Sequence, residues 1–155
     1  MRPITESSHV VIVARDYAEK YTGATNLEEA CRIIHDRGAL IAGVTDGANG
    51  SYFVWPDGTA YRCQPFPQAS VVDTTGAGDS FHGAFLSKLA MSIRQENTLN
   101  GEFIKPIDIL QSLDHKQLET AAIFASAVSA LNTQGIGGRS ALPSLETARN
   151  LAGLE

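Results

Sequence analysis

The first third of the chain alternates short apolar runs with more polar segments. Residues 9–14 (HVVIVA) and 39–45 (ALIAGVT) are continuous apolar runs, which are typical of strands buried on both faces of a parallel sheet. The segment between them predicts two helices: a short charged one over residues 15–21, and one that is capped by Asn26 and ends near Gly38. Strand, helix and strand in this order form a right-handed βαβ unit.

The next segment departs from this alternation of strands and helices. Residues 46–50 (DGANG) are typical of a turn. Residues 51–55 and 59–63 predict two short strands that form a hairpin around residues 56–58 (PDG). Residues 64–72 contain two prolines and little periodicity, so we interpret them as a loop.

The second half of the chain predicts helices and glycine-rich loops. Residues 76–94 form a long amphipathic helix that begins at a glycine-rich turn, and residues 95–107 are predicted to be polar and exposed. Residues 116–131 contain the alanine-rich stretch AAIFASAVSAL, whose apolar character requires burial. A second glycine-rich loop over residues 134–143 leads to a short helix over residues 144–151. The whole pattern predicts an α/β fold.

The composition is that of one globular domain. Of the 155 residues, 43% are hydrophobic and 19% are charged, which is too apolar a balance for a disordered chain. The formal net charge of −5 provides no basic stripe, so we expect no binding to nucleic acid. No segment reaches the roughly 18 apolar residues of a membrane span, and residues 1–9 lack the apolar core of a signal peptide.

The cysteines and most histidines show no metal-ligand spacing. Cys31 and Cys63 lie 32 residues apart without a CxxC motif, so we interpret them as buried free thiols in a reducing compartment. His9, His35 and His115 have no partners at ligand spacing and are predicted to be surface or capping residues. We therefore predict a cytoplasmic location.

The candidate chemistry lies where the long helix begins. Gly76, Ala77 and Gly78 are small, so a ligand can approach the backbone closely. A helix N-terminus presents unpaired N–H groups and the positive end of the helix dipole, which together bind phosphate and stabilise negative charge developing on it. Asp79 lies in the first turn, where a carboxylate can accept the proton of a hydroxyl that attacks phosphorus.

These residues alone leave a second interpretation open. Glycine-rich turns before helices are common, and an acid in the first turn stabilises a helix without any catalytic role. A resemblance favours the catalytic interpretation. Residues 73–85, DTTGAGDSFHGAF, resemble along their whole length the second signature of the PfkB/ribokinase family of carbohydrate kinases.

The resemblance implies a fold, an activity and site residues. The fold would be a ribokinase-like three-layer αβα sandwich, of which this chain holds the C-terminal half of the sheet and its helices. The activity would be phosphotransfer from ATP, with Mg²⁺, to a hydroxyl of a sugar or sugar-like substrate. The backbone of residues 76–79 would form the anion hole, and Asp79 would be the general base. Asp73 and Thr75 match positions that help hold a monovalent cation, such as K⁺, in several members.

Two weaker matches follow in the family's order. Residues 44–50, VTDGANG, resemble a strand end that approaches the nucleotide phosphates, which makes Thr45 and Gly47 candidates. A plain turn between a strand and a hairpin is the alternative.

The loop over residues 132–143, NTQGIGGRSALP, resembles the loop on the adenine side of the nucleotide. Small residues there would let the adenine lie flat against the backbone, which makes Asn132 and Gly137 candidates. Arg139 is a candidate phosphate contact, with a solvated loop arginine as the alternative.

The chain departs from the family pattern at one motif. Many members carry NxxE before a Thr-Gly dipeptide, and this motif is linked to magnesium and phosphate binding. Counting back from Thr22-Gly23, this chain has Ala14 and Tyr17 in its place, so the sequence assigns no magnesium ligand.

The resemblance covers nearly all of the chain but only the second half of the family's length. We therefore predict one partial domain over residues 1–155, without the N-terminal half that supplies the sugar contacts and the lid. The open edge and apolar face of such a half-sheet predict a homo-oligomer, with rearrangement or marginal stability as the alternatives.

A nucleotide- or phosphate-binding module without catalysis is the second hypothesis for the function. A dinucleotide-binding oxidoreductase is excluded by residues 76–78. They lack the GxGxxG spacing, and no acid follows a strand about 20 residues later.

Overall fold

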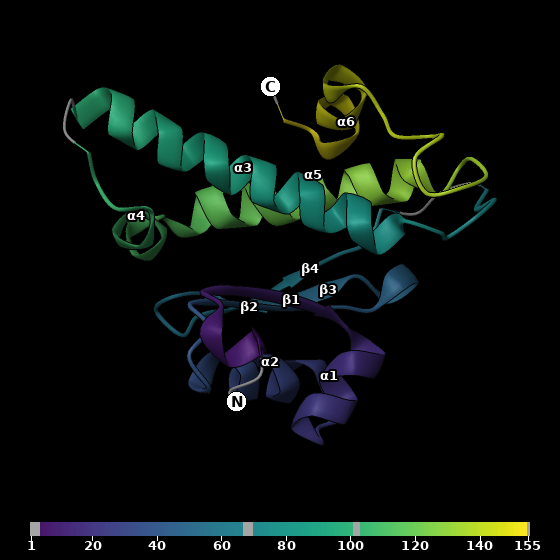
Figure 1. The fold of residues 1–155 in the computed structure, drawn as a ribbon. Coiled ribbons are helices and arrows are strands. Elements are labelled where there is room, and N and C mark those ends of the chain that lie inside the picture. Colours follow the sequence, from purple (N-terminus) through teal and green to yellow (C-terminus); the bar gives the residue numbers. More distant parts are fainter. Residues whose placement is uncertain (1–3, 67–69, 101–102, 155) are drawn as a thin grey trace.

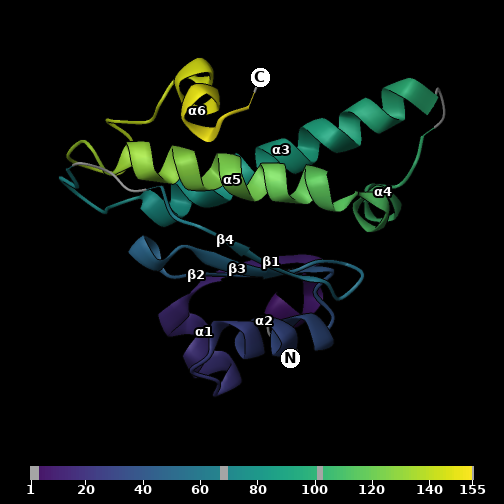
Figure 2. The same cartoon turned by 180° about the vertical axis from the view of Figure 1, so that it is seen from behind.

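Three layers make up the fold, with a four-stranded sheet between two layers of helices (Figure 1). The computed structural model describes residues 4–66, 70–100 and 103–154, and the backbone alone of residues 99 and 100. Helices α1 and α2 cover one face of the sheet, and α3 and α5 cover the other (Figures 1 and 2). This arrangement confirms the three-layer αβα sandwich predicted from the sequence.

The described strands and helices follow the predicted order, except that α4 was not predicted. The strands are β1 (Val10–Ala14), β2 (Ile41–Thr45), β3 (Ser51–Val54) and β4 (Ala60–Cys63). The α-helices are α1 (Arg15–Thr22), α2 (Leu27–Asp36), α3 (Ala77–Asn100), α4 (Pro106–Ser112), α5 (His115–Asn132) and α6 (Leu145–Ala152). Two 3₁₀ turns, η1 (Ile4–Ser7) and η2 (Gly47–Asn49), complete the list.

The sheet combines a parallel pair with a hairpin, in the order β1-β2-β3-β4. β1 and β2 are parallel, and Ile12 lies opposite Gly43. β2–β3 and β3–β4 are antiparallel, as the hairpin prediction requires. Helix α2 begins where predicted, because the Asn26 side chain accepts hydrogen bonds from the N–H groups of Glu28 and Glu29.

The two core clusters follow the alternation of side chains along the strands. Phe53 points to the α3–α5 side, where its ring stacks on Trp55 at 4.9 Å and on Phe85 at 5.3 Å between ring centroids. Val54, its neighbour in the chain, belongs to the cluster under α2. Cys31 and Cys63 are free and buried, as predicted, and burial raises the pKa of their thiols to about 12 and about 11.

The described side chains of residues 95–107 are exposed or half-buried, in line with the prediction, but the predicted helix end at residue 94 was wrong and α4 was not predicted. Helix α3 continues to Asn100, and α4 begins at Pro106, which fits the first turn of a helix because its missing N–H is not needed there. Ile104 packs against the core, and Ile109 of α4 is 2% exposed. Of the predicted loop over residues 64–72, residues 67–69 lie outside the described part.

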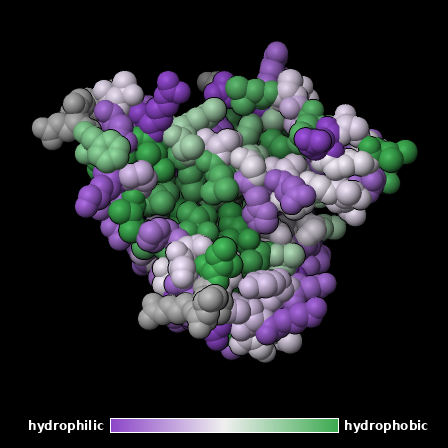
Figure 3. All heavy atoms as spheres, in the orientation of Figure 1, coloured by the Kyte–Doolittle hydropathy of each residue, from purple (hydrophilic) through white to green (hydrophobic). Residues whose placement is uncertain are grey.

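One side of the molecule carries an apolar surface, the β1–α3 face, which comprises Val10, Ile12, Leu86 and Ile93. β1 pairs with β2 alone among the described strands, and Val10, Ile12 and Ile93 are half-buried against the core. Leu86 on α3 is 49% exposed. Figure 3 shows apolar side chains gathered between α3 and the sheet on this side.

A histidine covers part of the open β1 edge beside this face. The Ile41 N–H donates to the His9 carbonyl, so alternate residues of β1 face β2 and the carbonyls of Val10 and Ile12 face outward. The His82 ring nitrogen Nε2 lies 3.0 Å from the Ile12 carbonyl oxygen. None of the described helices is both long and apolar enough to cross a bilayer.

Candidate functional site

Three segments meet at one end of the sheet. β2 ends there and is followed by η2, helix α3 begins there, and the loop between α5 and α6 lies beside that beginning (Figures 1 and 2). Ligands of open α/β sheets bind at the carboxyl ends of their parallel strands. The candidate residues of the sequence analysis lie in these three segments.

The start of α3 offers unpaired backbone donors. The Ala77 N–H donates to the Thr74 carbonyl at 3.1 Å, and the Ser80 N–H to the Gly76 carbonyl at 2.9 Å. Within the described part of the chain, the N–H groups of Gly78 and Asp79 have no acceptor. Asp79 lies in the first turn, as predicted, and it is exposed. An anion at this point would meet two free N–H groups and the positive end of a long helix.

The two glycines of this turn differ in what surrounds them. A Cβ atom at Gly78 would meet no protein atom within 4 Å, so the space there is free for a ligand. Gly76 has φ +75°, and a Cβ there would lie 2.5 Å from the Gly138 carbonyl oxygen. Gly76 is therefore required by the packing of the protein's own two glycine-rich loops, whereas Gly78 leaves the anion site open.

Asp73 connects these two loops. Its Oδ1 accepts the Thr75 N–H at 2.8 Å, and its Oδ2 accepts the Gly137 N–H, also at 2.8 Å. The bond from Thr75 and then the bond from Gly137 hold the pKa of the Asp73 carboxyl below its usual value. The carboxylate thus already accepts hydrogen bonds on both oxygens, and a monovalent cation at Asp73 and Thr75 would need further oxygen ligands.

The end of β2 carries an ion pair beside Thr45 and Gly47. Arg15, directly after β1, contacts the Asp46 carboxylate at 3.0 Å, and Asn49 donates to the same oxygen at 3.1 Å. This pair was not predicted from the sequence. It could have been found, because both residues directly follow neighbouring parallel strands, whose carboxyl ends meet. Thr45 is half-buried, and Gly47 is exposed with φ +50°.

The candidates of the second loop lie in different environments. Asn132, at the end of α5, is 0% exposed, and its side-chain nitrogen donates to the Gly138 carbonyl at 3.1 Å. It therefore supports the loop from beneath. Gly137 is half-buried with φ +88°, and Arg139 is exposed.

The described residues do not form a magnesium site of their own. They contain no group of three or more His, Cys, Asp or Glu side chains that could hold a metal ion. The motif positions Ala14 and Tyr17 carry no carboxylate or amide. These side chains do not fit a resident Mg²⁺, and magnesium would arrive with the nucleotide as part of the substrate.

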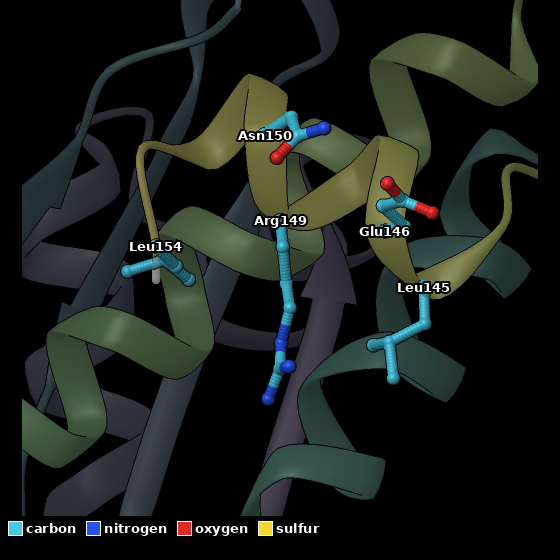
Figure 4. Close-up of a pocket in the computed structure, with 5 residues that line it drawn as sticks. All are labelled: Leu145, Glu146, Arg149, Asn150 and Leu154. Atoms are coloured by element: carbon cyan, nitrogen blue, oxygen red, sulfur yellow. The ribbon is translucent and has the colours of Figure 1, made fainter.

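Two surface cavities lie elsewhere. One, of about 390 Å³, is lined by Leu145, Glu146, Arg149, Asn150 and Leu154, and Figure 4 shows Arg149 extending from α6 across the helices below. The other, of about 520 Å³, lies around Trp55 and the His115–Asp57 pair, whose side chains are 2.7 Å apart. Neither includes a residue of the glycine-rich loops, so the anion site remains the candidate for chemistry.

Comparison with known proteins shows the family of the chain. Residues 1–145 match the pfkB family of carbohydrate kinases. The chain is 30% identical over 127 residues to the bifunctional ribokinase/ribose-5-phosphate isomerase A of Fructilactobacillus sanfranciscensis, covering 82% of this chain and 19% of that protein. It is 28% identical over 131 residues to the aminoimidazole riboside kinase of Salmonella typhimurium, covering 84% and 35%.

A solved structure shares the fold. A fructokinase double mutant from Vibrio cholerae, bound to fructose, ADP and a potassium ion, superposes with a TM-score of 0.76 at 23% identity, covering 96% of this chain and 42% of that one. The chain thus spans less than half the length of each of these relatives.

The fold is that of the ribokinase class of α/β proteins. With the match over residues 1–145, the chain belongs to the pfkB family of carbohydrate kinases.

Proposed function

We propose that this chain carries the nucleotide-binding and base-bearing half of an ATP-dependent kinase acting on a hydroxyl of a sugar or sugar-like substrate. One observation carries the proposal. The start of α3 presents the unpaired N–H groups of Gly78 and Asp79 in open space, and the Asp79 carboxylate is exposed beside them. The related riboside kinase and fructokinase act on sugar-like molecules by name.

The reaction would proceed as follows. Asp79 accepts the proton of the substrate hydroxyl, whose oxygen forms a bond to the γ-phosphorus while the bond to the ADP oxygen breaks. The anion hole formed by the backbone of residues 76–79, including Ala77, stabilises the charge on the transferring phosphoryl group. Mg²⁺ that arrives with ATP would offset the negative charge of the phosphates.

The remaining candidates complete a nucleotide site. Thr45 and Gly47 would approach the phosphates from the end of β2, and Gly137 would line the adenine side with Asn132 supporting its loop from beneath. K⁺ at Asp73 and Thr75 is part of the proposal, supported by the potassium ion bound to the fructokinase structure. The cytoplasmic location also stays a prediction.

The chain alone is proposed to be incomplete for catalysis. It would be one partial domain, without the N-terminal half that supplies sugar contacts and the lid. A nucleotide-binding module without catalysis is therefore the second candidate function, favoured by the share of its relatives that the chain covers.

Calorimetric titration with ATP and Mg²⁺, followed by a kinase assay on ribose and fructose, tests these proposals. We expect ATP to bind to the chain and turnover to be absent or weak. If turnover equals that of an intact kinase, the chain is complete. If neither ATP nor inorganic phosphate binds to the folded chain, the proposed function is wrong.

The homo-oligomer predicted from the sequence remains a proposal, with a second copy packing on the β1–α3 face. Light scattering is expected to give a mass above that of one chain, and Leu86→Lys is expected to restore the monomer by placing a charge on this face. Met91→Lys is the matched control, because Met91 is 54% exposed and lies nine residues from His82, on the opposite side of α3. A monomeric wild-type chain at high concentration would contradict the proposal.

A further inference from the structure

The start of α3 does not stand alone, because residues 72–77 are bound along their length to the end of α5 and the loop that follows. The N–H groups of Val72 and Asp73 donate to the Thr133 carbonyl at 2.8 and 3.1 Å. The Ser129 hydroxyl donates to the Ala77 carbonyl at 2.9 Å. Segments more than fifty residues apart thus form one hydrogen-bonded unit.

Asp73 occupies a particular place in this unit. One of its oxygens accepts an N–H from its own turn, at Thr75, and the other accepts an N–H from the opposite loop, at Gly137. Beside this bridge, Gly76 and Gly138 pack backbone against backbone. The carboxylate thus binds backbone donors of both glycine-rich loops.

We propose that Asp73 is a positioning residue that clamps the second glycine-rich loop onto the first and so holds the N–H groups of α3 in place for an anion. This inference rests on the proposed function insofar as it concerns the same anion site. It assigns Asp73 a role in the absence of any cation.

A carboxylate is required for this clamp. Two N–H donors that converge from different segments need one acceptor oxygen each, and a carboxylate has two with no competing donor. In Asp73→Asn the amide keeps one oxygen and turns an NH₂ group toward the other N–H, so one bond is lost and two donors face each other. The charge also strengthens both bonds.

The clamp and simple electrostatics predict opposite changes in phosphate affinity when the Asp73 charge is removed. Asp73 carries a negative charge near the anion site, so its removal would tighten phosphate binding if charge alone mattered. If Asp73 is the clamp, its removal lets the loops separate and weakens binding. The sign of the change in affinity therefore decides between them.

The experiment measures affinity for inorganic phosphate and for ATP in wild type, Asp73→Asn and Asp79→Asn. Asp73→Asn is expected to weaken both by about tenfold or more, which corresponds to the loss of one charge-assisted hydrogen bond. Asp79→Asn is the matched control. It removes one negative charge at the start of α3 without touching the clamp, so the affinity for phosphate and ATP is expected to stay equal or increase.

Titrations with and without K⁺ distinguish a clamp role of Asp73 from a role as a cation ligand. The titrations are repeated with tetramethylammonium in place of K⁺. The clamp predicts that the defect of Asp73→Asn persists without K⁺, whereas a defect that vanishes without K⁺ would overturn it. Equal or tighter binding by Asp73→Asn in both buffers would also overturn it.

Amide hydrogen exchange gives a readout that does not depend on ligand binding. The Gly137 and Thr75 amides are expected to exchange about tenfold faster or more in Asp73→Asn than in wild type, and at the wild-type rate in Asp79→Asn. If Asp73→Asn fails to fold, NMR of the wild-type chain tests the clamp instead. A scalar coupling from the Gly137 nitrogen to the Asp73 carboxyl carbon is expected, and a Gly137 amide that exchanges at the solvent-exposed rate without such a coupling would refute the clamp.

These measurements distinguish a failure of the Asp73 clamp from a failure of the proposed function. If wild type binds neither phosphate nor ATP while Gly137 is protected, the proposed function fails and the clamp stands. If wild type binds ATP and Asp73→Asn binds it equally well, the clamp fails and the proposed function stands.

Discussion

Asp79→Asn is expected to lower kcat by about 10²- to 10⁴-fold in any form of this protein that shows kinase turnover, because the amide cannot take the proton of the substrate hydroxyl. The dissociation constant for ATP is expected to change by less than about twofold, since nucleotide binding uses the backbone N–H groups of this turn and not the carboxylate. Steady-state kinetics and calorimetry measure the two quantities on the same preparation.

Asp108→Asn is the matched control for this variant. Asp108 is an exposed acid in the first turn of α4, so the substitution changes the same kind of position in a helix outside the site. It is expected to leave kcat within about twofold, as for an ordinary surface change. Near wild-type turnover by Asp79→Asn would show that Asp79 is the structural first-turn acid of the alternative interpretation.

Gly78→Val is expected to weaken the binding of ATP and inorganic phosphate by about tenfold or more, because its side chain fills the space beside the free N–H groups. The fold is expected to survive. A Cβ at Gly78 meets no protein atom within 4 Å, and valine is no worse than glycine in a helix. Calorimetry measures the affinity, and thermal unfolding checks that stability is unchanged within about 1 kcal/mol.

Gly83→Val provides the control within the same helix. Gly83 also lies in α3 with open space around its Cβ position, but more than one turn beyond the start. It is expected to bind phosphate like the wild type. If both valine variants lose affinity equally, the helix and not the space at Gly78 is responsible, and the anion hole is placed wrongly.

The elements that are stabilised by interactions between neighbouring residues could be predicted from the sequence. The strand of residues 39–45, the cap at Asn26 and the hairpin depend on neighbours within a few residues, and all three are present. α4 could not be predicted, because Ile109 becomes an anchor only when α3 and α5 are packed above it.

The candidate site also combines features that depend on local sequence with features that depend on distant contacts. The helix start with its glycines and Asp79 is a local pattern, so the sequence could propose it. The bridge from Asp73 to Gly137 and the contact of Gly76 with Gly138 join segments about 60 residues apart in the chain. Local sequence patterns do not show which distant segments come into contact, so these contacts could not be predicted. Small residues that serve close backbone packing and small residues that serve a ligand look alike in a sequence. Only the surroundings of Gly76 and Gly78 separate them.

The position of His82 at the β1 edge has a consequence for aggregation. Unpaired outward carbonyls on an edge strand are templates for unwanted strand addition, the step that begins sheet-like aggregation. By placing its imidazole on the Ile12 carbonyl, His82 obstructs a strand arriving at that point. The neighbouring apolar surface can still pack against side chains of a partner. The β1 edge therefore treats two kinds of contact differently. A partner can pack its side chains against the neighbouring apolar surface, whereas pairing of another strand with the β1 backbone is impeded at Ile12.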